Sequence, residues 1–408
     1  MQQQDHTTGF GLYIHWPFCR SKCPYCDFNS HVEGRVDHDS WRKALLSELD
    51  HVADAVGRRP LTSIFFGGGT PSLMAPKTAE ALIHRAIERF GADTGIEITL
   101  EANPTSAERQ RLADFKEAGV NRLSLGVQAL DDEALRFLGR EHSAKEALAA
   151  VDHAAGLFSR FSFDLIYARP NQTLDAWSAE LKQALDHAGG HLSVYQLTIE
   201  PGTRFFNLHR QGHLRLPEDD IQADMFELTR AMLTEARLPP YEISNHAAEG
   251  EACRHNLVYW QAGDYAGIGP GAHGRLTIGD QRFATSTERM PRAWLERALE
   301  NGHGELPREP ISGDEQVVEM LLMGLRLEDG IDISRLERVS GRPLRATLNA
   351  WAIERFEEEG WIDLSDRRLR ATSEGLARLN AIIGALLDPP ASPPQSDEQT
   401  SIEALVNG

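Results

Sequence analysis

Cysteine is scarce in this chain, with four residues among 408, and no apolar run approaches the roughly 20 residues of a membrane-spanning helix. Residues 1–10 are polar and lack the basic-then-apolar pattern of a secretory signal. Basic residues number 42 against 61 acidic ones, a formal net charge of −19, which disfavours attraction to phosphates. These features argue against a disulfide-stabilised secreted domain, an integral membrane protein and a nucleic-acid binder, and they predict a cytoplasmic protein.

Short strand-like segments alternate with helical patterns along the first 244 residues. The strand-like segments are residues 11–15, 61–66, 96–103, 121–128, 161–167 and 191–200. Between them, apolar residues recur every three to four positions, for example Trp41, Leu45, Leu49 and Val52. Alternation of this kind predicts an α/β fold with a parallel sheet. Six units fit a partial (β/α)6 barrel better than a closed eight-fold one.

Composition divides the chain into four predicted regions. We assign residues 1–240 to the partial barrel and 241–310, rich in Gly, His and aromatics, to a loop-like barrel extension. Residues 311–387 read as a helical, winged-helix-like domain, and the Pro/Ser-rich segment 388–408 as a disordered tail. The helical domain has ten arginines, no lysine and a larger number of acidic residues. We therefore expect a structural or protein-contact role for it and no nucleic-acid partner.

Three of the four cysteines, Cys19, Cys23 and Cys26, form a CxxxCxxC motif after the first strand-like segment. Three thiolates on one loop can hold three irons of a [4Fe–4S] cluster and leave the fourth iron open to an exchangeable ligand. The spacing also permits zinc, for which Cys253 or His15 would supply a fourth ligand, or a redox-active pair.

Polar residues collect where the predicted strands end, and active sites of parallel α/β folds lie at the carboxyl ends of the strands. A GGGTP segment contains Gly68, Gly69 and Thr70; glycine lets the backbone approach a ligand closely, although a sharp turn is an alternative use. The GK[ST] ending of a phosphate-binding loop is absent. Further polar candidates at or just past strand ends are Glu101, Gln128, Arg140 and Asp164.

Residues 13–28, YIHWPFC through CPYCDF, resemble the signature of radical S-adenosylmethionine (SAM) proteins, in particular the oxygen-independent coproporphyrinogen III oxidase family and its heme-chaperone branch. The resemblance extends over almost the whole chain. It implies a [4Fe–4S] cluster on Cys19, Cys23 and Cys26 with SAM on the open iron. It further implies that SAM is contacted by Tyr13, Tyr25, Phe28, Gly68, Gly69, Thr70, Glu101, Gln128, Arg140 and Asp164.

Departures from the family pattern bear on activity. The oxidases carry a further cysteine where this chain has Phe28, and a long arm before the motif where this chain has 18 residues. Both differences favour a chaperone without coproporphyrinogen III oxidase activity; the oxidase, and a radical SAM enzyme with another substrate, are the alternatives. The family sequence DLIYGLP also differs here, with Ala168 and Arg169 replacing glycine and leucine.

An HNxxYW motif comprises His255, Asn256, Tyr259 and Trp260, and it resembles the heme-associated motif of the chaperone branch. Histidine can ligate heme iron, and aromatic rings offer flat faces for a porphyrin. The alternative is that His255 bonds to the protein and the aromatics fill a core, with Cys253 or His273 as rival ligands.

The resemblance implies three cofactors or ligands, the [4Fe–4S] cluster, SAM and heme. It also implies a heme-acceptor protein as partner, for which a respiratory enzyme is a candidate, and a monomer that pairs when cluster and SAM are bound. The sequence leaves open whether SAM is cleaved or serves as a structural ligand.

Overall fold

The computed structural model describes residues 8–388. Within this range the chain forms two compact units. The first comprises residues up to 240 together with 244–258 and 263–310, and the second comprises 241–243, 259–262 and the residues from 311 onward. The tail that we predicted to be disordered lies outside the described residues, apart from Asp388. Among residues 8–388, none of the helices has the length and apolar character that a membrane crossing demands.

A single large sheet organises the first unit, with the strand order β13-β12-β11-β10-β1-β4-β5-β6-β7-β8-β9 among the described residues. The six predicted strands form its parallel centre. They are β1 (Phe10–Trp16), β4 (Leu61–Gly68), β5 (Ala92–Ala102), β6 (Arg122–Gln128), β7 (Arg160–Tyr167) and β8 (His191–Gln196). The prediction of a partial (β/α)6 barrel is thus confirmed.

The region 241–310, which we expected to be a loop-like barrel extension, instead adds strands to this sheet. The added strands are β9 (Asn245–Ala247), β10 (Asp264–Ile268), β11 (His273–Ile278), β12 (Gln281–Ser286) and β13 (Glu309–Pro310). Strand β10 is a seventh parallel strand, and its Ile268 lies opposite Ile14 of β1. The strand has only five residues, DYAGI, and lacks a clear apolar alternation, so its sequence did not indicate a strand.

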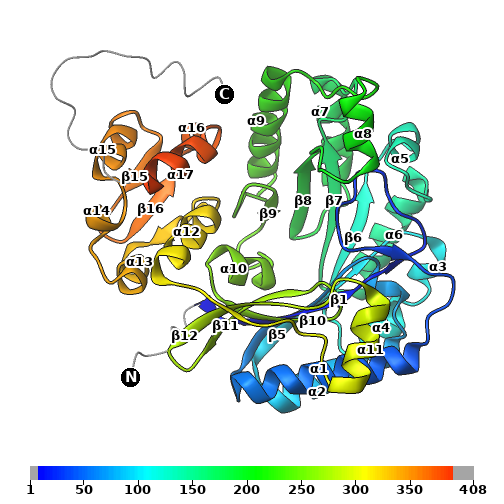
Figure 1. Cartoon of the computed structure of the whole chain (residues 1–408). Helices are drawn as coiled ribbons and strands as arrows, with labels where there is room; N and C mark the ends of the chain where they lie inside the picture. Colours follow the sequence, from blue (N-terminus) through cyan, green and yellow to red (C-terminus); the bar gives the residue numbers. More distant parts are fainter. Residues whose placement is uncertain (1–7, 389–408) are drawn as a thin grey trace. The chain divides into compact units, whose positions relative to one another are not determined.

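Helices cover the outside of the sheet, and α1 packs beside α2 and α11 (Figure 1). Asp37 caps α1 by accepting from the amides of Asp39 and Ser40, and the buried stripe that begins at Trp41 faces the core. The helices of this unit are α1 (His38–Val56), α2 (Pro76–Phe90), α3 (Ser106–Arg109), α4 (Leu112–Glu117), α5 (Asp132–Phe137), α6 (Ala144–Leu157), α7 (Leu174–Leu185), α8 (Arg204–Arg210), α9 (Asp219–Glu235) and α11 (Pro291–Asn301).

Helix α10 (Arg254–Trp260) carries the HNxxYW motif, and its last two residues are grouped with the second unit. A further short pair, β2 (Phe18–Cys19) and β3 (His31–Val32), closes the base of the cysteine loop. A 3₁₀ turn, η2 (Pro71–Leu73), follows the GGGTP segment.

The second unit consists of helices around a small antiparallel ribbon, as expected for a winged-helix-like domain. Its core includes Leu321, Leu336 and Ile353, all fully buried. The elements are α12 (Gly313–Gly324), β14 (Ile331–Asp332), α13 (Ile333–Ser340), α14 (Leu344–Thr347), α15 (Ala350–Glu358), β15 (Ile362–Leu364), β16 (Arg368–Ala371), α16 (Ser373–Leu376) and α17 (Leu379–Leu387).

Candidate functional site

A cavity of about 170 Å³ opens at the carboxyl ends of the central strands. Most of the predicted cofactor residues line it. They are Cys19, Cys23, Tyr25, Cys26, Phe28, Gly68, Gly69, Thr70, Glu101, Gln128, Arg140 and Asp164. The parallel topology brings these residues together, because β4, β5, β6 and β7 all end at the same edge of the sheet.

Each sulfur of the cysteine motif has a polar neighbour. Thr70 Oγ1 donates to Cys19 Sγ at 3.4 Å, Arg140 Nη1 donates to Cys23 Sγ at 3.4 Å, and the Ser30 hydroxyl lies 3.8 Å from Cys26 Sγ. Burial raises the pKa of the Cys19 and Cys26 thiols. Three free thiols with donors around them form a donor set suited to an iron–sulfur cluster, since hydrogen bonds to sulfur tune such sites.

The two residues that could have supplied a fourth zinc ligand are engaged elsewhere. His15 uses both ring nitrogens, which lie 3.0 Å from the Tyr13 hydroxyl and 2.9 Å from the Asn29 carbonyl oxygen. Cys253 is 1% exposed and its thiol donates to Glu97 Oε1 at 3.4 Å. Among residues 8–388, neither candidate therefore completes a closed four-ligand zinc site at the cysteine loop.

The GGGTP segment holds the cysteine loop against β4. The amide of Gly69 donates to Trp16 O at 2.7 Å, and that of Thr70 donates to Phe18 O at 2.9 Å. A Cβ on Gly69 would lie 2.8 Å from Phe18 O, so glycine is required there. These amides are thus used inside the protein, as in the sharp-turn interpretation, rather than left for a ligand.

Two carboxyl groups that repel each other, Glu101 and Asp164, line the cavity. Burial, and then repulsion by Asp164, raises the pKa of Glu101 to about 8. Burial likewise raises the pKa of Asp164 to about 6, against hydrogen bonds from Ser193 and Ser124 and the nearby arginines. A cationic ligand that entered this part of the cavity would favour the ionised form of both groups.

Arg140 ties three elements of the cavity wall together. Besides Cys23, its guanidinium donates to Gly126 O at 2.8 Å and to the side-chain oxygen of Asn103. Asn103 in turn donates to Thr70 Oγ1 at 3.2 Å. Our sequence reasoning did not select Asn103 as a site residue, although its place just after β5, two residues beyond Glu101, is the signal that could have found it.

His142 is a second lining residue that sequence reasoning missed. Its Nε2 lies 3.0 Å from Val127 O, and burial followed by the Arg140 charge lowers its pKa to about 4. It is therefore neutral at physiological pH. No local motif marks it, because its position depends on how the segment after α5 folds back onto β6.

Neither Ala168 nor Arg169 disturbs the cavity. Ala168 adopts the left-handed conformation, φ 57°, that glycine would favour at this position. Arg169 is buried and forms an ion pair with Glu180 of α7, whose Oε1 also accepts the Leu130 amide at 2.7 Å. The added charge is thus neutralised outside the cavity.

Tyr13 does not line this cavity and lies deeper in the barrel. Its ring stacks on Phe65 at 6.3 Å between centroids and on His255 at 6.4 Å. His255 stacks on Phe65 at 5.0 Å. The three ring centroids lie 5.0 to 6.4 Å from one another, so the rings form one compact cluster inside the barrel, which we call, together with the polar residues around His255, the barrel floor.

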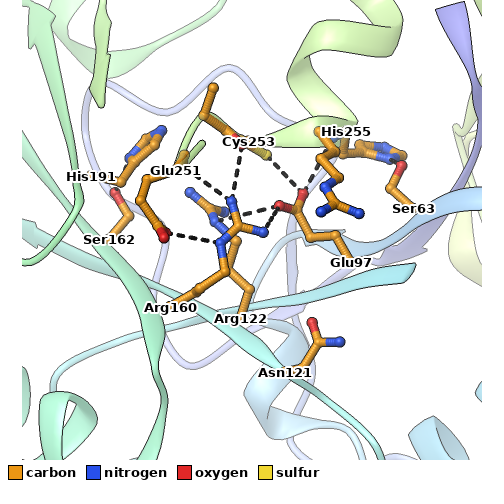
Figure 2. Close-up of polar contacts among 12 residues, drawn as sticks. Ser63, Glu97, Asn121, Arg122, Arg160, Ser162, His191, Glu251, Cys253 and His255 are labelled. Atoms are coloured by element: carbon orange, nitrogen blue, oxygen red, sulfur yellow. Dashed lines mark hydrogen bonds and ion pairs between the residues drawn. The ribbon is translucent and has the colours of Figure 1, made fainter. Parts of the chain in front are cut away.

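His255 lies within a buried polar cluster on the barrel floor (Figure 2). It is 1% exposed, its Nδ1 lies 2.8 Å from Ser63 Oγ, and its amide donates to Glu97 Oε1 at 3.3 Å. Burial lowers its pKa to about 3, so the ring is neutral. Glu97 also pairs with Arg160 at 2.7 Å and Arg122 at 4.0 Å.

The remaining heme candidates differ in exposure. Asn256, Tyr259 and Trp260 are half-buried along α10, whereas His273 is exposed at the start of β11. Burial raises the pKa of Cys253 to about 12, which keeps it a thiol at neutral pH. In this conformation His255 is therefore buried and hydrogen-bonded within the protein, which was the alternative to heme ligation. A ligand as large as heme cannot reach its ring.

Comparison with known proteins agrees with this arrangement. The chain matches the Radical SAM superfamily over residues 13–184 and the HemN C-terminal domain over residues 311–378. It is 46% identical to the heme chaperone HemW of Escherichia coli (strain K12) over 71% of this chain and 77% of that protein. HemW of Bacillus subtilis (strain 168) is 34% identical over 92% of this chain and 98% of its own length.

A mitochondrial relative from Bos taurus, radical S-adenosyl methionine domain-containing protein 1, is 40% identical over 92% of this chain and 87% of the relative. The solved structure of E. coli coproporphyrinogen III oxidase (HemN) superposes with a TM-score of 0.77 over 93% of this chain and 90% of the oxidase. At 22% identity that likeness shows the fold alone. The chain belongs to the radical SAM superfamily and, within it, to the family that includes the heme chaperone HemW.

Proposed function

We propose that this protein is a heme chaperone that binds heme and passes it to an acceptor protein, and that it carries a [4Fe–4S] cluster with exchangeable SAM. The observation that carries the proposal is the cavity with its three free thiols, within a chain whose relatives include proteins named heme chaperone HemW. The cysteines require a reducing compartment, for which we propose the cytoplasm.

In this proposal Cys19, Cys23 and Cys26 would hold the cluster and leave one iron for SAM as an exchangeable ligand. When bound, the cluster supplies an electron-rich site that can support reductive cleavage of SAM. Thr70, Ser30 and Arg140 orient the sulfurs through the contacts described above. Glu101 and Asp164 face the cationic part of SAM, and Tyr25 offers a ring for its adenine.

The heme site is proposed at the HNxxYW motif, with His255 as axial ligand and Cys253 and His273 as alternatives. Because His255 is held by Ser63 and Glu97, ligation requires the first turn of α10 to leave the barrel floor. Local opening of a buried segment is slower than diffusion. Heme binding should therefore show a slow phase whose rate does not rise with heme concentration.

An anaerobic hemin titration of the cluster-loaded protein tests the proposal, followed by the Soret band. About one heme per chain with saturation supports it. Loss of the band shift in His255→Ala, with retention in His273→Ala, assigns the ligand to the motif. Saturable binding that is equal in both variants and lost in Cys253→Ser moves the ligand to Cys253. Absence of specific binding in the wild-type chain contradicts the chaperone function.

The alternative function is oxygen-independent oxidation of coproporphyrinogen III. Its support is the similarity of this fold to that of HemN. A parallel assay measures coproporphyrinogen III turnover and the release of methionine and 5′-deoxyadenosine under strong reductant. We expect no turnover. SAM cleavage without turnover would assign SAM a reactive role in the chaperone, and an uncleaved SAM would assign it a structural one.

A further inference from the structure

His51, His303 and Glu305 converge on one point of the first unit, remote in sequence from the cysteine motif. Their candidate ligand atoms all lie within 4.8 Å of one another. His51 Nε2 is 2.6 Å from Glu305 Oε2, and the two imidazole rings stack with centroids 3.8 Å apart. Neither the cavity nor the barrel floor uses these residues.

The backbone between His303 and Glu305 is held by contacts to Glu48 and Trp294. The amide of Gly304, between them, donates to the buried carboxylate of Glu48 at 2.7 Å. A Cβ on Gly304 would lie 2.2 Å from the Trp294 ring, so the loop packs directly on that side chain. Glu48 and His51 are three residues apart on α1 and share one face. The loop and the helix therefore fix the backbone of the three residues, while the stacked imidazole rings must turn about their side-chain torsions to point one nitrogen each at a common cation.

One polar atom of the cluster, on His303, lacks a hydrogen-bond partner among the described residues, whereas the Glu305 carboxylate is engaged by Arg308 and His51. The Nδ1 atom of His303 is buried and has no hydrogen-bond partner among the described residues. Glu305 has a 7% exposed side chain and receives Arg308 through both oxygens, at 2.7 and 2.9 Å. The unpaired imidazole nitrogen, the buried carboxylate and the second histidine together offer two nitrogens and one oxygen as metal ligands.

We propose that His51, His303 and Glu305 form a binding site for a borderline divalent cation, with zinc as the first candidate. Two imidazoles and one carboxylate suit Zn²⁺ and its neighbours in the transition series, whereas Mg²⁺ and Ca²⁺ prefer oxygen-only sites. His51, with a 32% exposed side chain, leaves the site open to solvent for further water ligands. Any proton shared between His51 Nε2 and Glu305 Oε2 passes to water when the metal binds.

Arg308 explains how the site remains stable without metal. Its guanidinium neutralises Glu305 and can keep Oε1 when Oε2 turns to the metal. The cation would then link α1 to the segment after α11 and tighten the edge of the sheet, because Glu305 also bridges to Thr287. The role that follows is a structural clamp rather than a catalytic centre.

Zinc titration of the full-length, cluster-loaded protein tests this assignment, with bound zinc and iron measured together after desalting. Loading the cluster first keeps the cysteines occupied by iron. We expect about one zinc per chain in the wild type and a thermal midpoint that rises on zinc addition. His303→Ala should lose both effects, because it removes one of the three ligands. The variant should still fold, since His303 Nδ1 makes no hydrogen bond that the substitution could break. Mg²⁺ should not bind.

His187→Ala is the matched control, because His187 pairs with Asp152 at 2.8 Å on the same unit without a second histidine. It should retain the extra zinc. Glu305→Gln should weaken binding at least tenfold, and melting curves without zinc report whether each variant folds. Equal zinc content in His303→Ala and wild type, zinc uptake matched by iron loss, or no zinc in the wild type would overturn the proposal.

Discussion

His255 and Ser63 share a 2.8 Å hydrogen bond that joins helix α10 to strand β4 on the barrel floor. The histidine of the proposed heme motif is thus buried near the amino end of β4, whereas the cysteine cavity lies at the carboxyl end of that strand. Because Ser63 lies outside the motif, a substitution of Ser63 can change how readily His255 becomes accessible to heme.

Ser63→Ala removes the partner of His255 without altering the motif. We expect the free energy of unfolding to fall by about 1–3 kcal/mol, because the substitution removes a buried hydrogen bond. We also expect a faster slow phase of heme binding, measured by stopped-flow absorbance. Ser162→Ala is the matched control, since Ser162 makes an equivalent 2.7 Å bond to His191. A similar acceleration in both variants would contradict the idea that the Ser63–His255 bond limits the rate of heme binding.

Glu97→Gln removes the carboxylate shared by the floor's two arginines. Glu97 has no exposed side-chain surface, so both arginines would lose a buried carboxylate, although Arg160 keeps its pair with Glu251 at 2.9 Å. We expect a loss of about 3–5 kcal/mol in denaturant unfolding. The exposed pair Arg292–Glu296 provides the comparison, and Glu296→Gln should have little or no effect. A loss in Glu97→Gln no larger than in that control would argue against a structural role for the cluster.

SAM affinity should rise with pH up to about 8 in the cluster-loaded protein. Because the pKa of Glu101 is raised to about 8, the free cavity carries a neutral Glu101 at pH 6. A bound sulfonium favours the ionised form, so binding below pH 8 must release this proton and is weakened. Glu101→Gln should show a smaller pH dependence in equilibrium binding, and the titration of SAM itself is common to both proteins. Parallel pH profiles would contradict the assignment of Glu101.

Gly69→Ala should lower the amount of cluster that the protein retains. Its Cβ would meet backbone atoms of Pro17 and Phe18 at 2.8 Å, which moves the segment that leads into Cys19. Iron and sulfide per chain after reconstitution measure the effect. Gly34→Ala is the control, because no atom lies within 4 Å of a Cβ at that position and it follows the same loop. Full iron content in Gly69→Ala would show that the loop tolerates the shift.

The parallel sheet and the cavity could be predicted because both depend on local patterns. Apolar segments such as 61–66 marked the strands, and parallel topology then required Gly69, Glu101 and Asp164 to meet at one edge. Strand β10 could not be predicted in the same way, since its short sequence is stabilised by pairing with β1, about 250 residues earlier.

Burial was the property that sequence reasoning estimated least well. The residue types in Tyr13 and His255 suited ligand contact, yet both rings are packed against Phe65 inside the barrel. Nothing near His255 in the sequence indicates Ser63 or Glu97, which approach it only once β4 and β5 are in place. The proximity of His51, His303 and Glu305 could not be predicted for the same reason, because α1 and the segment after α11 are far apart in the chain.

The pairing of β10 with β1 also has a consequence for synthesis. When the cysteine motif leaves the ribosome, β4 follows within about 50 residues, but residues 264–268 emerge only after the six central strands. One edge of β1, next to the future cluster, therefore remains an open strand edge until late in translation. Closure of that edge has a high contact order, so we expect the β1 amides that pair with β10 to be protected from hydrogen exchange later than those that pair with β4 during refolding.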